Sequence, residues 1–522
     1  MTVAPLSPAL TTLTGLSERE KRLVEALSEK LVGHAHSNVE ANAYYESKHI
    51  LDFAGITIPQ DVASKVAPVV GTPATVVDVL DERLDFLGWD DAALSGDLGL
   101  DEVYDANELD AEGPMAHLDA LIFGTSFARV GTGEGGVPLV TMHPPTTTTG
   151  VRDPATRRLA AAWSSLKVEN GETVEGVLDL PDESVLVARK NGSWTVEDRD
   201  EHRLGRVPVV QFSNRPRASR RGGRSEITAA IRSLTEDMMR AVLGMNVNTM
   251  FYSIPQLLIL GRGPDAFKDR NGNPVPGWKI LAGHALALPK DKEGDVPTIE
   301  QLTVASPQPF IEQLREFRMQ VASEAGMPAD YLGIQTANPS SADAIRMGES
   351  RLVKRTERRQ TGFGRSWQEV ARLALLIRDG AIPEGFDSRV AVDWQPASTP
   401  TRAATADELT KYISVGALDP QSSVVRKRMS LTRSEARLLD IESQRNQARQ
   451  TVEGLIAAQQ GDQDGEAADP AAEATAMRQR FEALGVAIRA GVDPDDAAAR
   501  LDLAGIQFTG ERPASLRPRD EE

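Results

Sequence analysis

Residues 326–375 read GMPADYLGIQTANPSSADAIRMGESRLVKRTERRQTGFGRSWQEVARLAL, and this stretch decides the fold. A polar loop, marked by Gly and Pro, leads directly into a long amphipathic helix. Asn338 followed by Pro339 predicts the start of that helix, because Asn caps unpaired amides and Pro is tolerated at the first helical position. The stretch contains no plausible catalytic set. We interpret it as a mechanical element, a loop held in position by a bent helix.

The predicted helix is basic in its first half and apolar in its second. Six basic residues stand against three acidic ones between residues 343 and 359. Gly362 and Gly364 then interrupt the pattern and predict a kink. Apolar residues return at helical spacing, at Phe363, Trp367, Val370, Ala371 and Ala374.

The composition limits the class of protein. The 522 residues are enough for three or four domains, or for one elongated subunit of several parts. The absence of cysteine excludes disulfides and thiolate chemistry, and it fits a reducing cytosol. The N-terminus lacks the pattern of a signal peptide, and no apolar run approaches the ~20 residues of a membrane span. We therefore expect a soluble protein with no membrane partner.

The net charge of -18 would repel DNA on average, whereas a protein that grips phosphates normally has a basic surface. Such repulsion suits a channel through which DNA slides, although acidity also simply favours solubility. Twelve acidic residues and a single base, Arg83, lie between Asp81 and Glu112. This segment is either a solvated face or a surface for a channel or a partner.

Local patterns in the first half predict helices followed by a β-rich module. Ser17 and Glu20 form a capping-box pattern that opens a helix to about residue 32. Further helices are expected at residues 74–87 and 113–123. Strands alternating with turns are expected at residues 127–130, 138–142, 159–166, 173–180, 184–188, 194–198 and 207–212.

Two amphipathic helices bracket a Gly- and Pro-rich insert. Ser225 is the predicted cap of the first helix, and the second follows Pro309. Short strands are expected in the insert at residues 256–260, 279–282 and 285–288, so it should form a compact β module away from the body. The apolar stripes of the two helices, at helical spacing, include Ile227, Ile231, Leu234 and Met238, then Phe310, Leu314, Phe317 and Val321.

After a strand at residues 389–394, the chain becomes almost wholly helical. Helices are expected at residues 404–415, 422–429, 434–459, 472–484 and 494–504. An acidic stretch at residues 459–473 is typical of a flexible linker.

Several charged clusters are candidate binding sites. Five arginines between Arg215 and Arg224 could contact nucleic acid or an acidic partner, form a solvated linker, or pair with the acidic face of a neighbouring subunit. No phosphate-binding loop of the motor type is present. Asp97, Asp101, Glu102 and Asp105 could in principle hold two metal ions for DNA cleavage. We nevertheless expect no metal site and no cofactor.

Two ordered blocks of sequence resemble the SPP1-type portal proteins of tailed bacteriophages, and are closest to those of phages of actinobacteria. The blocks run in family order from about residue 44 to about residue 400. They comprise Tyr44-Tyr45-Glu46, the stretches at residues 71–78, 87–89 and 116–127, Tyr331-Leu332-Gly333, residues 338–344, Glu349, Phe363 and Trp367.

The resemblance implies an α+β fold, an elongated portal-type subunit. The implied parts are a disordered N-terminus (1–15), a mixed wing domain (16–224), a first stem helix (225–250), a small β clip (251–306), a second stem helix (307–325), a tunnel loop (326–342), a long kinked helix with a wing strand (343–400), a C-terminal α-helical crown (401–510) and a disordered tail (511–522).

The implied function is structural and non-enzymatic. Family members form a ring, usually of twelve copies, at one capsid vertex, and double-stranded DNA passes through it without sequence specificity during packaging and ejection. The implied partners are the terminase large subunit, the major capsid and scaffolding proteins and the head–tail connector, in the virion and in the host cytoplasm during assembly. The alternatives are a metal-dependent DNA-processing enzyme and an oligomeric scaffold unrelated to DNA.

The resemblance also implies site roles. The eight stripe residues named above would pack the stem helices. Trp278 and Lys279 are candidates for docking at the clip, because an aromatic and a basic residue adjoin at a turn. The tunnel loop facing DNA would comprise Gly333, Ile334, Gln335, Thr336, Ala337, Asn338, Ser340 and Ser341.

Overall fold

The computed structural model describes most of residues 15–398 and part of the remainder. The described ranges are 15–51, 68–90, 98–190, 192–252, 257–260, 296, 298–301, 306–334, 342–398 and 402–420, with short stretches and single residues between 422 and 503. The chain divides into two units, Met1–Ser398 and Thr399–Glu522, and each is considered by itself.

The first unit begins with helix α1 (Glu18–Tyr45), which starts at the predicted capping box. The Ser17 amide donates to Glu20 Oε2 at 2.6 Å, and the Glu20 amide donates to Ser17 Oγ at 3.3 Å. The predicted end near residue 32 is wrong. The helix continues to Tyr45 because Ala41 and Tyr44 extend its buried face into the main core.

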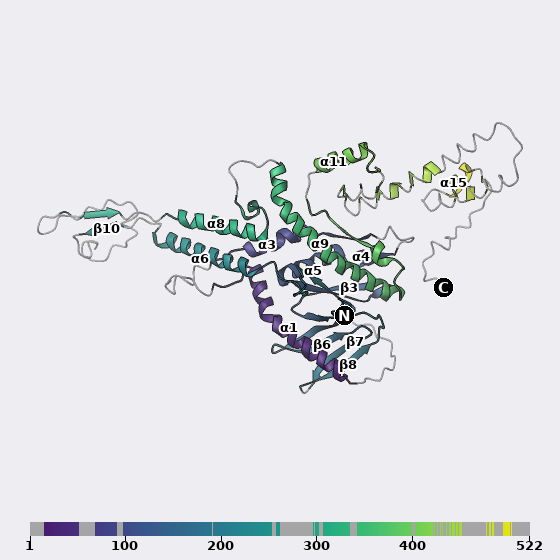
Figure 1. The fold of residues 1–522 in the computed structure, drawn as a ribbon, viewed down its shortest axis with the longest axis horizontal. Helices are drawn as coiled ribbons and strands as arrows, with labels where there is room; N and C mark the ends of the chain where they lie inside the picture. Colours follow the sequence, from purple (N-terminus) through teal and green to yellow (C-terminus); the bar gives the residue numbers. More distant parts are fainter. Residues whose placement is uncertain are drawn as a thin grey trace, which may run out of the picture. The chain divides into compact units, whose positions relative to one another are not determined.

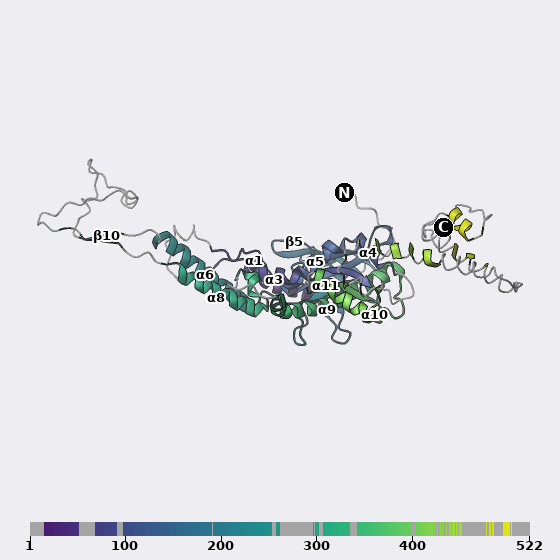
Figure 2. The same ribbon diagram turned by 90° about the horizontal axis from the view of Figure 1, so that it is seen from above.

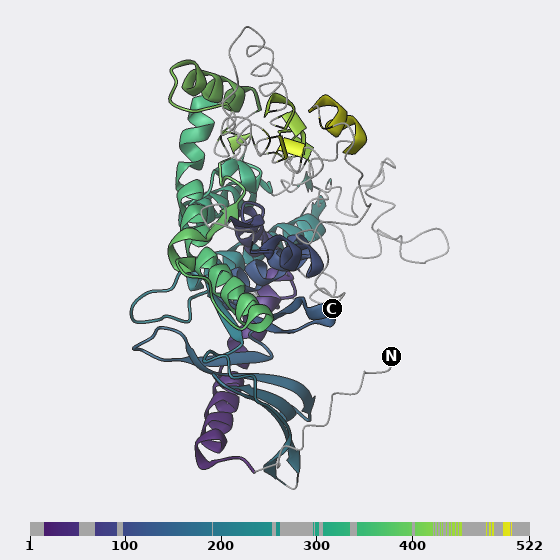
Figure 3. The ribbon, with the colours of Figure 1, turned by 90° about the vertical axis from the view of Figure 1, so that its right-hand side faces the viewer.

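Antiparallel strands form the β-rich module that the sequence predicts. One sheet has the order β4 (Thr148–Arg152), β5 (Leu159–Glu169), β6 (Glu172–Asp179), β7 (Ser184–Lys190) and β8 (Ser193–Asp200). Helix α1 lies along this sheet, and its Val24 and Leu27 pack with Trp163 and Leu178 (Figure 3). A second sheet has the order β3 (Pro138–His143), β2 (Thr125–Thr132) and β9 (Val209–Ser213). All seven predicted strands are confirmed, and β4 was not predicted.

The acidic part of the sequence forms more elements than expected. Helix α3 (Thr72–Asp81) ends before the predicted end at residue 87, and β1 (Phe86–Asp90) begins within the last two residues of the predicted span. Strand β1 pairs antiparallel with β12 (Ala391–Trp394), which follows α10 (Phe386–Arg389) and confirms the strand predicted there. Helix α4 (Leu100–Ala106) was not predicted, and α5 (Leu109–Phe123) contains the expected helix.

The two amphipathic helices, α6 (Ala229–Tyr252) and α8 (Gln308–Ala325), lie side by side (Figures 1 and 2). They run antiparallel, with β10 (Leu257–Leu260) paired to β11 (Thr298–Gln301) between them in the sequence. The predicted first cap is wrong by three residues. Thr228 Oγ1 accepts from the Ile231 amide at 3.4 Å, whereas Ser225 Oγ accepts from the Ile227 amide before the helix.

The packing of these two helices follows the predicted stripes. Ile227, Ile231, Met238 and Val321 are buried in the main core, and Leu234, Leu314 and Phe317 pack against it. Phe310 approaches the backbone of Gly244, where a Cβ atom would lie 2.7 Å from its Cε1. The strands expected at residues 279–282 and 285–288 lie outside the described residues.

Helix α9 (Ala342–Asp379) follows a short 3-10 turn, η3 (Ala329–Leu332). It remains helical through Gly362 and Gly364, so these glycines do not end the helix, and the kink predicted there stays a prediction. A Cβ on residue 364 would lie 3.3 Å from Trp394 Nε1, so that glycine permits close packing against β12. The predicted start at Asn338 and Pro339 lies outside the described residues.

The second unit contains α11 (Arg402–Ser414) and α15 (Pro494–Arg500), which confirm the first and last helices predicted there. Between them, helical residues occur within each of the other three predicted spans. A small core joins Leu484, Ala498 and Leu501. The predicted linker at 459–473 and the tail fall outside the described residues, as does all of the N-terminal segment before Gly15. None of the described helices is long and apolar enough to span a bilayer.

Candidate functional site

The loop between η3 and α9 is described only at its beginning. Gly333 ends η3 with a left-handed backbone, φ 74°. Ile334 is 8% exposed, so its side chain packs into the subunit instead of facing outward, which corrects the role expected for it. The rest of the predicted tunnel loop, from Gln335 to Ser341, lies outside the described residues, as do Trp278 and Lys279.

A three-residue clamp joins the two ends of this loop. The Tyr331 hydroxyl in η3 donates to Glu349 Oε1 in α9 at 2.7 Å. Arg83 Nη2 lies 2.7 Å from the Tyr331 oxygen and 3.1 Å from Glu349 Oε1. Arg83 Nη1 also donates to the carbonyl of Ala397 at 2.9 Å. We call Arg83, Tyr331 and Glu349 the loop clamp.

The sequence carries a signal for the loop clamp. Tyr331 and Glu349 belong to the resemblance, and Arg83 is the one base in the acidic segment 81–112. Arg83 is only 8% exposed, so its charge requires partners nearby. Burial and the hydrogen bond to Glu349 raise the pKa of Tyr331, which keeps its hydroxyl protonated as a donor.

The second half of α9 is anchored in an aromatic core. Trp367 is fully buried, stacks on Phe86 with ring centroids 4.2 Å apart, and donates from Nε1 to His117 Nε2 at 2.8 Å. Burial lowers the pKa of His117 to about 3, so the ring is neutral and accepts this bond. Trp89 Nε1 donates to the Trp367 carbonyl at 3.0 Å. The apolar spacing of Phe363 and Trp367 predicted this burial.

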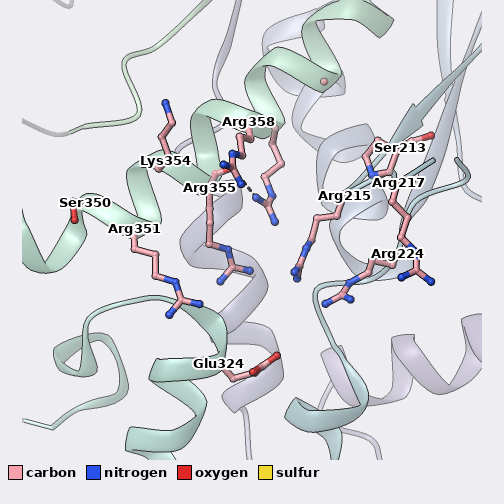
Figure 4. A pocket seen from close by; sticks show the side chains of 13 residues that line it. Ser213, Arg215, Arg217, Arg224, Glu324, Ser350, Arg351, Lys354, Arg355 and Arg358 are labelled. Atoms are coloured by element: carbon pink, nitrogen blue, oxygen red, sulfur yellow. Dashed lines mark hydrogen bonds between the residues drawn. The ribbon is translucent and has the colours of Figure 1, made fainter. Parts of the chain in front are cut away.

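The basic first half of α9 faces the predicted arginine cluster across a cavity of about 880 Å³ (Figure 4). Seven arginines and one lysine line this cavity, which we call the basic pocket. Arg215, Arg217 and Arg224 come from the cluster, and the others come from α9. The sequence alone does not show that the two groups meet, because more than a hundred residues lie between them.

One buried carboxylate neutralises part of the basic pocket. Glu226 is 1% exposed and pairs with Arg355 at 2.7 Å, with Arg215 at 3.2 Å and with Arg359. Asn214 Nδ2 donates to Glu226 Oε1 at 3.0 Å. Burial would raise the pKa of Glu226, but the guanidinium groups of Arg359 and Arg355 outweigh it and lower that pKa. Glu226 is therefore ionised at neutral pH.

The acidic segment supplies exposed carboxylates on α4 and at the start of α5. Asp101, Glu102, Asp105, Glu108 and Asp110 are all exposed, and we call them the acidic face. Within the part of the chain that the structure describes, no group of three or more His, Cys, Asp or Glu residues could hold a metal ion. Asp97, the remaining member of the weighed metal set, is outside that part.

Asp81, at the end of α3, destabilises the fold at neutral pH. Burial, followed by the charges of Asp78, Asp85 and Glu82, raises its pKa to about 7. In the folded protein Asp81 therefore keeps a proton that the unfolded chain releases. The free energy of unfolding consequently decreases as the pH rises from about 4 to about 7. We expect Asp81→Asn to raise the free energy of unfolding by on the order of 1–3 kcal/mol at pH 8. Urea unfolding at pH 5, 6 and 8 measures this.

The matched control is Asp110→Asn, which removes an exposed carboxylate from α5 and should leave the free energy of unfolding almost unchanged. If Asp81→Asn raises the free energy of unfolding by the same amount at every pH, the raised pKa of Asp81 is contradicted.

Comparisons with known proteins show which sequences are similar to this chain. The sequence profile of the family described as "Phage portal protein, SPP1 Gp6-like" matches residues 44–451. The chain is 33% identical over 395 residues to the portal protein of Mycobacterium phage D29, a match that covers 73% of this chain and 80% of that protein. The portal protein of Mycobacterium phage L5 is 32% identical over 385 residues, covering 72% of this chain and 78% of that protein.

A solved structure, the virion of a native gene transfer agent particle, contains a chain similar to this one. The TM-score is 0.42 at 14% identity, over 76% of this chain and 99% of that chain.

Proposed function

Because the chain belongs to the SPP1 Gp6-like family of phage portal proteins, a structural family, we propose that its copies form a ring at one capsid vertex through which double-stranded DNA enters and leaves the head. Twelve is the expected number of copies. In this proposal α6 and α8 are the stem helices, residues 251–306 form the clip, and the second unit forms the crown.

The observation that carries the ring is the unpaired side of the α6–α8 pair. Phe317 and Val321 of α8 pack inward, yet Ile311 and Met319 are 48% and 47% exposed. Residues eight apart differ by about 80° around a helix axis, so both side chains lie on the outward half of α8. A neighbouring copy that packs against this half would remove the two apolar side chains from water.

The loop clamp supports a role for the loop in contact with DNA. It fixes both ends of a segment whose remaining tip residues, Gln335, Thr336, Ala337, Asn338, Ser340 and Ser341, are uncharged. Such side chains make weak polar contacts with phosphates, and the net charge of -18 opposes tight binding. DNA would slide past this surface.

The partners follow from the same proposal. The clip, with Trp278 and Lys279 as candidates, would dock the terminase large subunit and later the head–tail connector. Major capsid and scaffolding proteins would surround the ring during assembly in the host cytoplasm. The finished ring would remain in the virion, and ATP hydrolysis would belong to the terminase rather than to this chain.

Single-particle imaging of the purified protein, with native mass spectrometry, tests the ring. We expect closed rings with a central hole wide enough for a DNA duplex. Monomers or open clusters at micromolar concentration under several salt conditions would contradict the proposal. Magnesium-dependent DNA cleavage by the same sample would favour the enzyme alternative instead.

A variant at Gly244 tests the stem pair. In Gly244→Leu the new side chain collides with Phe310, so we expect a loss of roughly 1–3 kcal/mol in unfolding free energy and fewer rings. Gly348→Leu on α9 is the matched control, because nothing lies within 4 Å of its Cβ position. Thermal unfolding and native mass would be measured for both. Equal effects at the two positions would argue against close packing at Gly244.

A further inference from the structure

The basic pocket contains more positive charge than its own carboxylates neutralise. Eight cationic side chains line it, against Glu324 on its wall, the buried Glu226 beside it and Glu357, which pairs with Lys354 at 2.8 Å. Arg355 and Arg359 are committed to Glu226. Arg217 and Arg358 are exposed and form no ion pair within the described ranges. The pocket is therefore built to receive an anionic group from outside the subunit.

The basic pocket has an opening between its two walls. Figure 4 shows Arg215, Arg217 and Arg224 on one wall, with Arg351, Arg355 and Arg358 on α9 opposite them. The Nε atom of Arg359 is buried and has no hydrogen-bond partner, although its other two nitrogens are bonded. An incoming carboxylate would reduce the repulsion among these guanidinium groups.

The chain itself carries a complementary surface. The acidic face consists of five exposed carboxylates within ten residues, 101–110, with no basic residue among them. Glu102, Glu108 and Asp110 form no ion pair among the residues that the structure describes. Figure 2 shows α4 toward the upper side of the body and α9 at its lower edge.

We propose that the basic pocket of one copy receives the acidic face of the next copy in the ring. A closed ring is built from heterologous contacts, in which two different patches of the same chain meet. Two separate patches of opposite charge meet this requirement and fix the direction of packing. The inference rests on the proposed ring and names the surfaces that hold it together.

DNA is the competing occupant, and the charge balance decides against it. A phosphate-binding surface gains affinity from many cations that face the polymer. Here the free cations are confined to a pocket in a subunit of net charge -18, whose own acidic face supplies enough carboxylates to fill it. The occupant is therefore a second copy of this chain.

Paired charge reversals test the contact. The pocket variant is Arg217→Glu with Arg358→Glu, and the face variant is Glu102→Arg with Asp110→Arg. All four side chains are exposed, so the fold should survive, which circular dichroism would verify. Each double variant should raise the concentration at which half of the protein is in rings at least tenfold. Combining the two sets should restore assembly toward that of the wild type.

The control is Arg189→Glu with Arg203→Glu, which reverses two arginines of the β-rich module, 37% and 81% exposed, outside the pocket. Its assembly should match the wild type. If all variants assemble into rings, the inference is overturned while the proposed ring still stands. The inference is also overturned if the double variants lose assembly and the combined variant does not regain it. If the pocket variant loses only binding to a DNA duplex in gel-shift assays, the occupant is nucleic acid. If the wild type forms no rings, the proposed function fails first.

Discussion

Replacing Glu226 with Gln is expected to lower the free energy of unfolding by roughly 3–5 kcal/mol, the range for removing one partner of a buried ion pair. Glu226 is 1% exposed and holds Arg215, Arg355 and Arg359 around it. Without its charge, these guanidinium groups would repel one another in a poorly solvated site. Chemical denaturation of the two proteins at pH 7 measures the loss.

The effect of Glu226→Gln should depend on pH with a definite sign. The pKa of Glu226 is lowered in the folded state, so the ionised carboxylate stabilises the fold above the ordinary glutamate pKa of about 4.3. This contribution is lost as the pH falls through the lowered value. The variant and the wild type should therefore converge in acid, and a difference that persists there would contradict the ion-pair explanation.

Glu324→Gln is the matched control for Glu226→Gln. Glu324 lines the same basic pocket but is exposed, so its removal should change the free energy of unfolding by less than about 0.5 kcal/mol. A comparable loss in both variants would mean that the pocket responds to total charge and not to one buried carboxylate.

Trp367→Ala is the second change with a large expected effect, roughly 3–5 kcal/mol of destabilisation. The side chain is fully buried, and its removal leaves a cavity beside Phe86 and an unpaired His117 Nε2. Trp367→Phe keeps much of the volume and loses the hydrogen bond, so about 1–2 kcal/mol is expected. Thermal and chemical unfolding would rank the two variants.

Met347→Ala provides the comparison on the same helix. Met347 is 78% exposed near the start of α9, and its truncation should be nearly neutral in the subunit. If Trp367→Ala were also nearly neutral, the aromatic core would not be what anchors α9.

Elements with a strong local signal were predictable from the sequence. The capping box predicted the start of α1, and strand patterns that alternate with turn residues predicted β5 to β8. Strand β1 was missed because its partner β12 lies about 300 residues away, and pairing at that distance leaves no mark on a short window. The helical pattern alone did not predict that the missing side chain of Gly364 permits close contact with Trp394.

The same distinction between local signals and long-range contacts applies to the candidate sites. The spacing of Phe363 and Trp367 was sufficient to predict their burial. The basic pocket was not predictable, because Arg215 and Arg355 meet only when the segment after β9 folds against α9. Glu226 stood two residues after the arginine cluster in the sequence, and only burial reveals that it organises three guanidinium groups.

The loop clamp also makes one guanidinium group a mechanical junction. Arg83 holds Tyr331 and Glu349 on either side of the loop, and it holds the carbonyl of Ala397, just before the first unit ends. A force that pulls on the loop would therefore load the same side chain that holds the carbonyl of Ala397. Tension on the loop and the position of the last residues of the first unit are consequently coupled through Arg83.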